Sequence, residues 1–129
     1  MTLLDINLDN IPERKLPSEG EHKLRVETVI EQLEAANPRL AMGLRSLTET
    51  GSEMAWLTLW MPNGEDENRD IESQRRILDF VTAFQVPVGK KGLDTESMVG
   101  CTGWGKVVHR TREDTGEDVA NVTKILVGK

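Results

Sequence analysis

The sequence predicts a mainly β domain with one helix. Three observations lead to this fold class. Several segments alternate apolar with polar residues, which is the period of a strand with one buried face. One segment carries apolar residues at helical spacing. The chain has 129 residues, enough for a domain that buries roughly two thirds of its unfolded surface, and its one cysteine rules out an intrachain disulfide.

An N-terminal arm, residues 1–20, is expected to precede the domain proper, residues 21–129. The arm has little periodicity and is interrupted by Pro12, Pro17 and Gly20, so we expect it to pack only in part. It lacks the basic stretch and apolar run of a secretory signal, and no segment is apolar for the roughly 20 residues that span a bilayer. The expected location is the cytoplasm, without membrane contact.

Three predicted strands follow the arm, at residues 22–33, 39–48 and 54–61. Each alternates apolar with polar or charged side chains, so each is expected to have one core face. The connection around Gly51 between the second and third strands is short, which predicts that these two strands pair antiparallel. Gly43, within the second strand, is expected to mark a bulge or a bend.

The third strand carries the feature on which the functional interpretation depends. Trp56, Thr58 and Trp60 share one face of it, and Leu57 and Leu59 share the other. The leucine face predicts core. The Trp–Thr–Trp face is flat and aromatic, which suits stacking of nucleic-acid bases. The alternative is that the indoles are buried against a loop, the N-terminal arm or a partner chain.

A helix is expected at about residues 70–85, with Asn68 or Asp70 as its N-cap. Acidic residues in its first turn suit the helix dipole, and Pro87 and Gly89 end it. Its apolar stripe consists of Ile71, Ile77, Leu78, Phe80, Val81 and Phe84.

Residues 88–98 are expected to form a loop, and two further strands are expected near 101–112 and 118–127, joined by a turn at residues 114–116. The order is strand-strand-strand-helix-strand-strand. This is the topology of the five-stranded Greek-key barrel known as the OB-fold. The helix stripe is then expected to close one end of the barrel.

A resemblance to a known family is carried by Glu19-Gly20-Glu21-His22, the strand pair across Gly51, Phe80-Val81-Thr82-Ala83-Phe84, Met98-Val99-Gly100 and Asn121-Val122. In these segments the chain resembles small proteins encoded by phages and prophages that have OB-like domains. The resemblance covers about residues 19–127. It implies single-stranded-DNA binding in phage replication or recombination, within a bacterial host cell. The chain departs from it in having no tyrosine and no acidic C-terminal tail.

Cations on the outward faces of the predicted strands extend the aromatic face. In OB-folds the second and third strands face the oligonucleotide. Indoles would stack on bases and cations would neutralise phosphates, with Glu27 as the nearest opposing charge. On the fourth strand, the cations either extend this surface or form a solvated edge. The candidate nucleic-acid-binding residues are Lys23, Arg25, Arg39, Arg45, Trp56, Thr58, Trp60, Lys106 and Arg110.

The sequence marks no catalytic or metal site. Residues 100–106 come close to a phosphate loop, but Val107 stands where Ser or Thr must hold magnesium, and the following residues favour a strand. His22, His109 and Cys101 lie far apart, without zinc-like spacing. We therefore expect a protein without enzymatic activity, metal or cofactor.

The formal net charge of -6 counts against nucleic-acid binding at the level of the whole chain, although local charge matters more for a groove. The acidic balance favours the alternative function, a phage structural or regulatory module whose tryptophan face meets another protein. The expected partners are single-stranded DNA, further copies of the chain in a homo-oligomer, and replication or recombination proteins.

Overall fold

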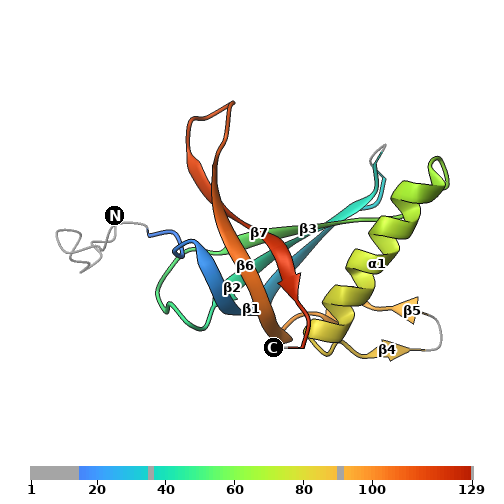
Figure 1. Cartoon of the computed structure of the whole chain (residues 1–129), viewed down its shortest axis with the longest axis horizontal. Coiled ribbons are helices and arrows are strands. Elements are labelled where there is room, and N and C mark those ends of the chain that lie inside the picture. The colour runs from blue at the N-terminus through green and yellow to red at the C-terminus, as the bar shows by residue number, and fades with distance from the viewer. Residues whose placement is uncertain (1–14, 35–36, 90–91, 129) are drawn as a thin grey trace, which may run out of the picture.

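The structure, a computed structural model, describes residues 15–34, 37–89 and 92–128. The predicted strands and the predicted helix are all present, with ends that differ by a few residues (Figure 1). No helix in the described ranges is long and apolar enough to span a membrane. The elements are β1 (Gly20–Gln32), β2 (Arg39–Ser46), β3 (Ala55–Trp60), α1 (Glu67–Ala83), β4 (Val88–Gly89), β5 (Gly92–Leu93), the short 3-10 helix η1 (Thr95–Ser97), β6 (Thr102–Thr111) and β7 (Asp118–Leu126).

Five strands close into a barrel in the order β1-β2-β3-β7-β6, and β6 pairs with β1. Neighbours run antiparallel except β3 and β7, which run parallel and meet at a single bridge, Trp56 with Asn121. The second and third predicted strands, β2 and β3, form the expected antiparallel pair. This arrangement confirms the predicted fold class, a mainly β domain with one helix and an OB-like five-stranded barrel.

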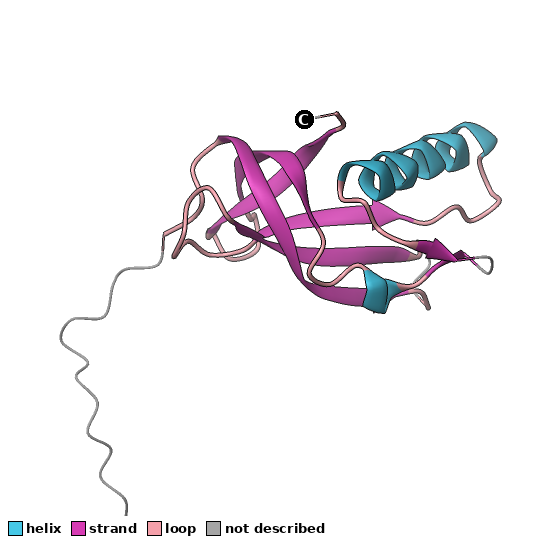
Figure 2. Cartoon of the chain, turned by 90° about the horizontal axis from the view of Figure 1, so that it is seen from below, coloured by secondary structure: helices cyan, strands magenta, loops and turns pink. Residues whose placement is uncertain are grey.

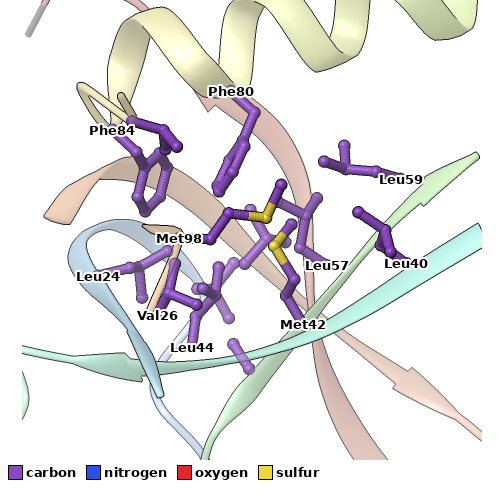
Figure 3. Packing of buried hydrophobic residues seen from close by; sticks show 14 of the residues in the cluster. Leu24, Val26, Leu40, Met42, Leu44, Leu57, Leu59, Phe80, Phe84 and Met98 are labelled. Atoms are coloured by element: carbon purple, nitrogen blue, oxygen red, sulfur yellow. The ribbon is translucent and has the colours of Figure 1, made fainter. Parts of the chain in front are cut away.

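The hydrophobic core fills the barrel (Figure 3). The helix α1 packs alongside the strands at one end of the barrel (Figure 2). Leu57 and Leu59 are fully buried, as their alternation with the tryptophans predicted. Phe80 and Phe84 project from α1 into the core, with ring centroids 4.7 Å apart. Burying a side chain of this size contributes roughly 1.5–3 kcal/mol relative to leaving it exposed. Other large core side chains are Leu24, Val26, Leu40, Met42, Leu44, Met98 and Val107.

Glycines in β6 allow close packing against α1 and β7. A Cβ atom added at Gly103 would lie 2.6 Å from Cδ1 of Phe84, and one added at Gly105 would lie 2.8 Å from Cγ1 of Val122. Neither position has room for a side chain. The residues after Gly105 continue as a strand, so this glycine-rich segment lacks the strand–loop–helix context of a phosphate loop.

The helix begins earlier than the sequence predicted. It spans Glu67–Ala83, and its N-cap is Asp66, not Asn68 or Asp70. The Asp66 carboxylate accepts a hydrogen bond from the backbone N–H of Asn68 at 3.0 Å. Asp70 instead accepts from two backbone N–H groups of the preceding loop, which fixes the approach of the chain to the helix.

One loop prediction was wrong. Residues 88–98 contain the short antiparallel pair β4–β5 and the helix η1. Gly43, expected to mark a bulge or a bend, faces a bulge that lies on β1 between Val26 and Thr28. A Cβ atom at Gly43 would lie 2.9 Å from both the sulfur of Met54 and Cγ2 of Thr28, so glycine permits this close approach.

The segment just ahead of β1 is attached to the barrel. Pro17 is buried, and its carbonyl oxygen accepts a hydrogen bond from Nε2 of His109 at 2.6 Å. The next carbonyl oxygen, that of Ser18, accepts from Nε2 of His22 at 2.7 Å. Packing on the barrel therefore begins before the predicted domain boundary. The rest of the predicted arm, residues 1–14, lies outside the described residues.

Candidate nucleic-acid interface

The outer face of β3 carries the three residues that the sequence singled out. Trp56, Thr58 and Trp60 point away from the core, because Leu57 and Leu59 between them are fully buried. The Trp60 side chain is 39% exposed, and Trp56 and Thr58 are half-buried. The indole of Trp60 is therefore accessible to a ligand.

These three residues form one side of a groove of about 430 Å³. The other side comes from β7, while α1 and the β6–β7 hairpin rise on either side of β3 (Figure 1). A groove is possible because β3 and β7 pair at one bridge and are not bonded to each other beyond it. We call it the β3–β7 groove; it is lined by Trp56, Thr58, Trp60, Arg76, Arg110, Asn121, Val122 and Thr123.

Two guanidinium groups lie close to the Trp60 ring. The Cζ atom of Arg39 is 5.2 Å from the ring centroid, and that of Arg69 is 6.0 Å away. Arg39 is the cross-strand partner of Trp60 on β2, and Arg69 comes from the first turn of α1. Cations within about 6 Å of an indole are attracted by its π electrons. Trp60 also borders a hollow of about 450 Å³, lined by Asn37, Trp60, Arg69, Glu72, Ser73 and Arg76.

Two of the predicted cations are partly neutralised. Arg25 and Arg45 are cross-strand partners on β1 and β2. Both approach Oε1 of Glu27, at 2.5 Å from Arg25 and 3.5 Å from Arg45. The hydrogen bond from Arg25 holds the pKa of the Glu27 carboxyl below its usual value, so this group is ionised at neutral pH. One negative charge therefore offsets one of the two positive charges, and neither arginine lines the β3–β7 groove.

Lys23 and Lys106 lie on another part of the barrel surface. Lys23 is opposite Trp104 of β6, and Lys106 follows two residues later on that strand. Both are exposed, and neither lines the β3–β7 groove. The predicted cations and tryptophans therefore do not form one continuous surface. Arg39 and Arg110 lie beside the tryptophans of β3, whereas the other predicted cations do not.

The prediction missed polar residues from α1 and β7. Arg69 and Arg76 are seven residues apart on α1, which places them on one side of the helix, about two turns apart. Asn121 and Thr123 line the groove from β7. The arginine spacing is visible in the sequence, but the side of α1 that turns toward β3 depends on how Phe80 packs in the barrel.

The cations near the tryptophans are not bound to carboxylates. Within residues 15–34, 37–89 and 92–128, no ion pair involves Arg39, Arg69, Arg76 or Arg110. Of the described residues, Glu72 is the one carboxylate that lines the hollow beside Trp60, and none lines the β3–β7 groove. The local charge is thus positive although the net charge of the chain is -6.

The buried histidine serves the fold. His22 is 2% exposed; its Nε2–H donates to the Ser18 carbonyl, and its Nδ1 shares a hydrogen bond with the Ser46 hydroxyl at 2.8 Å. Both ring nitrogens thus have a partner within the fold. In the described part of the chain, no three His, Cys, Asp or Glu side chains are grouped as metal ligands would be.

Comparison with known proteins assigns no family. No protein-family model matches the chain, and no curated protein sequence matches it. The geometry and charge of the β3–β7 groove are therefore the basis for proposing a function.

Proposed function

We propose that this chain binds single-stranded DNA without sequence preference. The observation that carries the proposal is the β3–β7 groove, where Trp56 and Trp60 lie together with Arg76 and Arg110. Stacking of a base on an aromatic side chain contributes roughly 1–3 kcal/mol and tolerates any sequence, because every base has a π face. The guanidinium groups would bind the phosphates between the stacked bases.

The spacing of the indoles favours an extended single strand. Trp56 and Trp60 are four residues apart on β3, which separates their Cα atoms by about 13 Å at roughly 3.3 Å per residue. Neighbouring bases in a duplex strand are about 3.4 Å apart along the axis. The two indoles are too far apart to stack on neighbouring bases of that geometry. A single strand can extend and turn separate bases toward them, whereas duplex bases are already stacked on one another.

The resemblance to phage and prophage proteins supports a role in phage replication or recombination inside a bacterial cell. The partners in this proposal are single-stranded DNA and the replication or recombination proteins that act on it. A homo-oligomer would present several grooves to one strand and raise its affinity. Lys23, Arg25, Arg45 and Lys106 belong to the proposal as cations that a longer strand reaches beyond the groove. It includes no catalytic residue, metal or cofactor.

Intrinsic tryptophan fluorescence tests this proposal. Titration with oligo-dT at low salt is expected to quench the fluorescence, and the affinity is expected to fall as salt is added. Duplex DNA of equal length is expected to bind more weakly. Absence of oligo-dT binding at low salt would overturn the proposal.

A matched pair of arginine variants locates the binding. Arg76→Ala removes a cation of the groove and is expected to weaken oligo-dT binding about tenfold or more, since a hydrogen bond to a charged group contributes roughly 1.5–3 kcal/mol. Arg112→Ala removes the same charge from an exposed residue that pairs with Asp114 outside the groove, and is expected to change little. Equal losses in the two variants would place binding elsewhere.

A further inference from the structure

A second groove lies at the end of the barrel, on the core side of β3. Its volume is about 380 Å³, and it shares no lining residue with the β3–β7 groove. We call it the end groove. Its apolar surface comes from Leu33, Leu40, Leu59, Met61, Ile77 and Met98, of which Leu40, Leu59 and Met98 are seen in Figure 3.

Strand alternation on β3 and a bulge on β1 determine that Leu59 and Glu31 line the end groove. Leu59 lies on the opposite side of β3 from Trp60, so the same strand serves both grooves. On β1, the extra residue Glu27 reverses the alternation, and Glu31 comes to lie opposite the buried Leu40. The bulge thus brings a carboxylate to an otherwise apolar opening.

The end groove is open to solvent although it is mostly apolar. Leu33 is 51% exposed at its border, and Met61 and Ile77 are half-buried along it. Leu59 and Met98 lie beneath them with no exposed surface. A concave apolar surface with a few polar groups at its edge is typical of a binding site. Its size suits a few aliphatic side chains rather than a folded element.

The charged residues that the structure describes at the edge of the end groove are acidic. Glu31 accepts a hydrogen bond from the Thr95 hydroxyl at 2.6 Å, and Asp94 accepts one from the backbone N–H of Glu96 at 3.0 Å. Each ionised carboxylate retains further acceptor sites. Among the described residues that line the groove there is no lysine or arginine. Nucleic acid would therefore be repelled here.

We infer that the end groove binds a short segment of a partner protein that carries aliphatic side chains flanked by lysine or arginine. The aliphatic side chains would pack against Leu33, Met61 and Ile77, and the cations would pair with Glu31 and Asp94. Residues 1–12 of this chain lack that pattern, since they carry Asp5 and Asp9 and neither lysine nor arginine. The inference does not depend on DNA binding, and both grooves can be occupied together.

Two synthetic peptides test the inference on the isotope-labelled full chain by NMR. The probes are acetyl-Lys-Leu-Leu-Lys-Leu-Leu-Lys-amide and the same peptide with glutamate in place of lysine. The basic peptide is expected to shift the amide signals of Leu33, Leu93 and Met98 and to bind at least about tenfold more tightly than the acidic one. Absence of binding, equal binding of both peptides, or shifts that centre outside the end groove would overturn the inference.

Variants of exposed residues keep the test independent of folding. Leu33→Ser removes an aliphatic contact without adding a charge and is expected to weaken binding of the basic peptide by about tenfold or more. Leu78→Ser, at a residue that is 63% exposed on α1 outside the end groove, is the control and is expected to change nothing. The double variant Glu31→Gln with Asp94→Asn is expected to remove the preference for the basic peptide. A chain that self-associates in solution and dissociates on Leu33→Ser would show that a second copy fills the groove, and would overturn the inference.

Discussion

Leu59 and Trp60 are neighbours in the chain and have opposite roles. Leu59 has no exposed surface, whereas Trp60 is 39% exposed beside the guanidinium groups of Arg39 and Arg69. Strand alternation alone predicted this difference. It could not predict Arg69, because contact between α1 and β3 is set by tertiary packing and leaves no local pattern.

Alanine substitutions of these neighbours are expected to separate stability from binding. Leu59→Ala should lower the free energy of unfolding by about 2–5 kcal/mol, since it opens a cavity in the core. Trp60→Ala should lower it much less and weaken oligo-dT binding by roughly 1–3 kcal/mol. Urea unfolding followed by circular dichroism measures the first quantity, and the anisotropy of a labelled oligonucleotide measures the second. If Trp60→Ala lowers the free energy of unfolding as much as Leu59→Ala does, the indole belongs to the core.

Glu49 links the segment ahead of β1 to the loop after β2, and its contribution to the stability of the fold should depend on pH. Its carboxylate accepts hydrogen bonds from the Ser18 hydroxyl at 2.5 Å and from the Ser18 backbone N–H at 3.0 Å. These bonds, the hydroxyl bond foremost, hold the pKa of Glu49 below its usual 4.5. Because the pKa of Glu49 is lower in the folded state than in the unfolded state, the stabilisation is fully present at pH values above the unfolded-state pKa. It is lost as the pH falls through the lower pKa of the folded state.

Glu49→Gln is therefore expected to be less stable than the natural chain at neutral pH, and the difference should shrink below about pH 4.5. Thermal unfolding of both proteins across the range from about pH 7 to about pH 3 measures this difference. A difference that stays constant over the whole range would show that the charge of the carboxylate is not its cause.

At the scale of elements, β6 depends on glycine for its contact with α1. Gly103→Ala should lower the free energy of unfolding by about 1–3 kcal/mol, because the new methyl group would lie 2.6 Å from the Phe84 ring. Gly89→Ala is the control, since the nearest atom to its Cβ is 3.8 Å away. Urea midpoints of the two variants give the comparison, and equal midpoints would show that Phe84 moves aside without cost.

The five barrel strands and α1 were predictable from the sequence, whereas the short elements β4, β5 and η1 and the local irregularities were not. Period-two and helical patterns each extend over many residues, so the barrel strands and α1 were predicted. Asp66 lies in an acidic run in which several side chains are able to cap, and only the loop geometry selects it. The bulge at Glu27 interrupts one period of an otherwise regular strand, and it changes which side Glu31 faces.

At the scale of the whole molecule, charge is segregated between two grooves. Arginines of β2, α1 and β6 that have no carboxylate partner among the described residues lie near the tryptophans, while carboxylates border the end groove. Arg76 and Ile77 are adjacent on α1 and line different grooves, so one helix is a wall of both. The net charge of the chain therefore does not predict what either groove binds. Composition counted against DNA binding only because it averages the charges of the two grooves.

The salt dependence of DNA binding should reflect the groove and not the net charge of -6. Each phosphate neutralised on a single strand contributes about -0.7 to the slope of log K against log salt concentration. If Arg39, Arg69, Arg76 and Arg110 contact two to four phosphates, the slope should lie between about -1.4 and -2.8. Arg76→Ala should reduce its magnitude by about 0.7, and Lys23→Ala, on the far part of the barrel, should leave it unchanged for a short oligonucleotide. A slope near zero would mean that these cations do not touch the phosphates, and a change with Lys23→Ala alone would place the strand over β1 and β6.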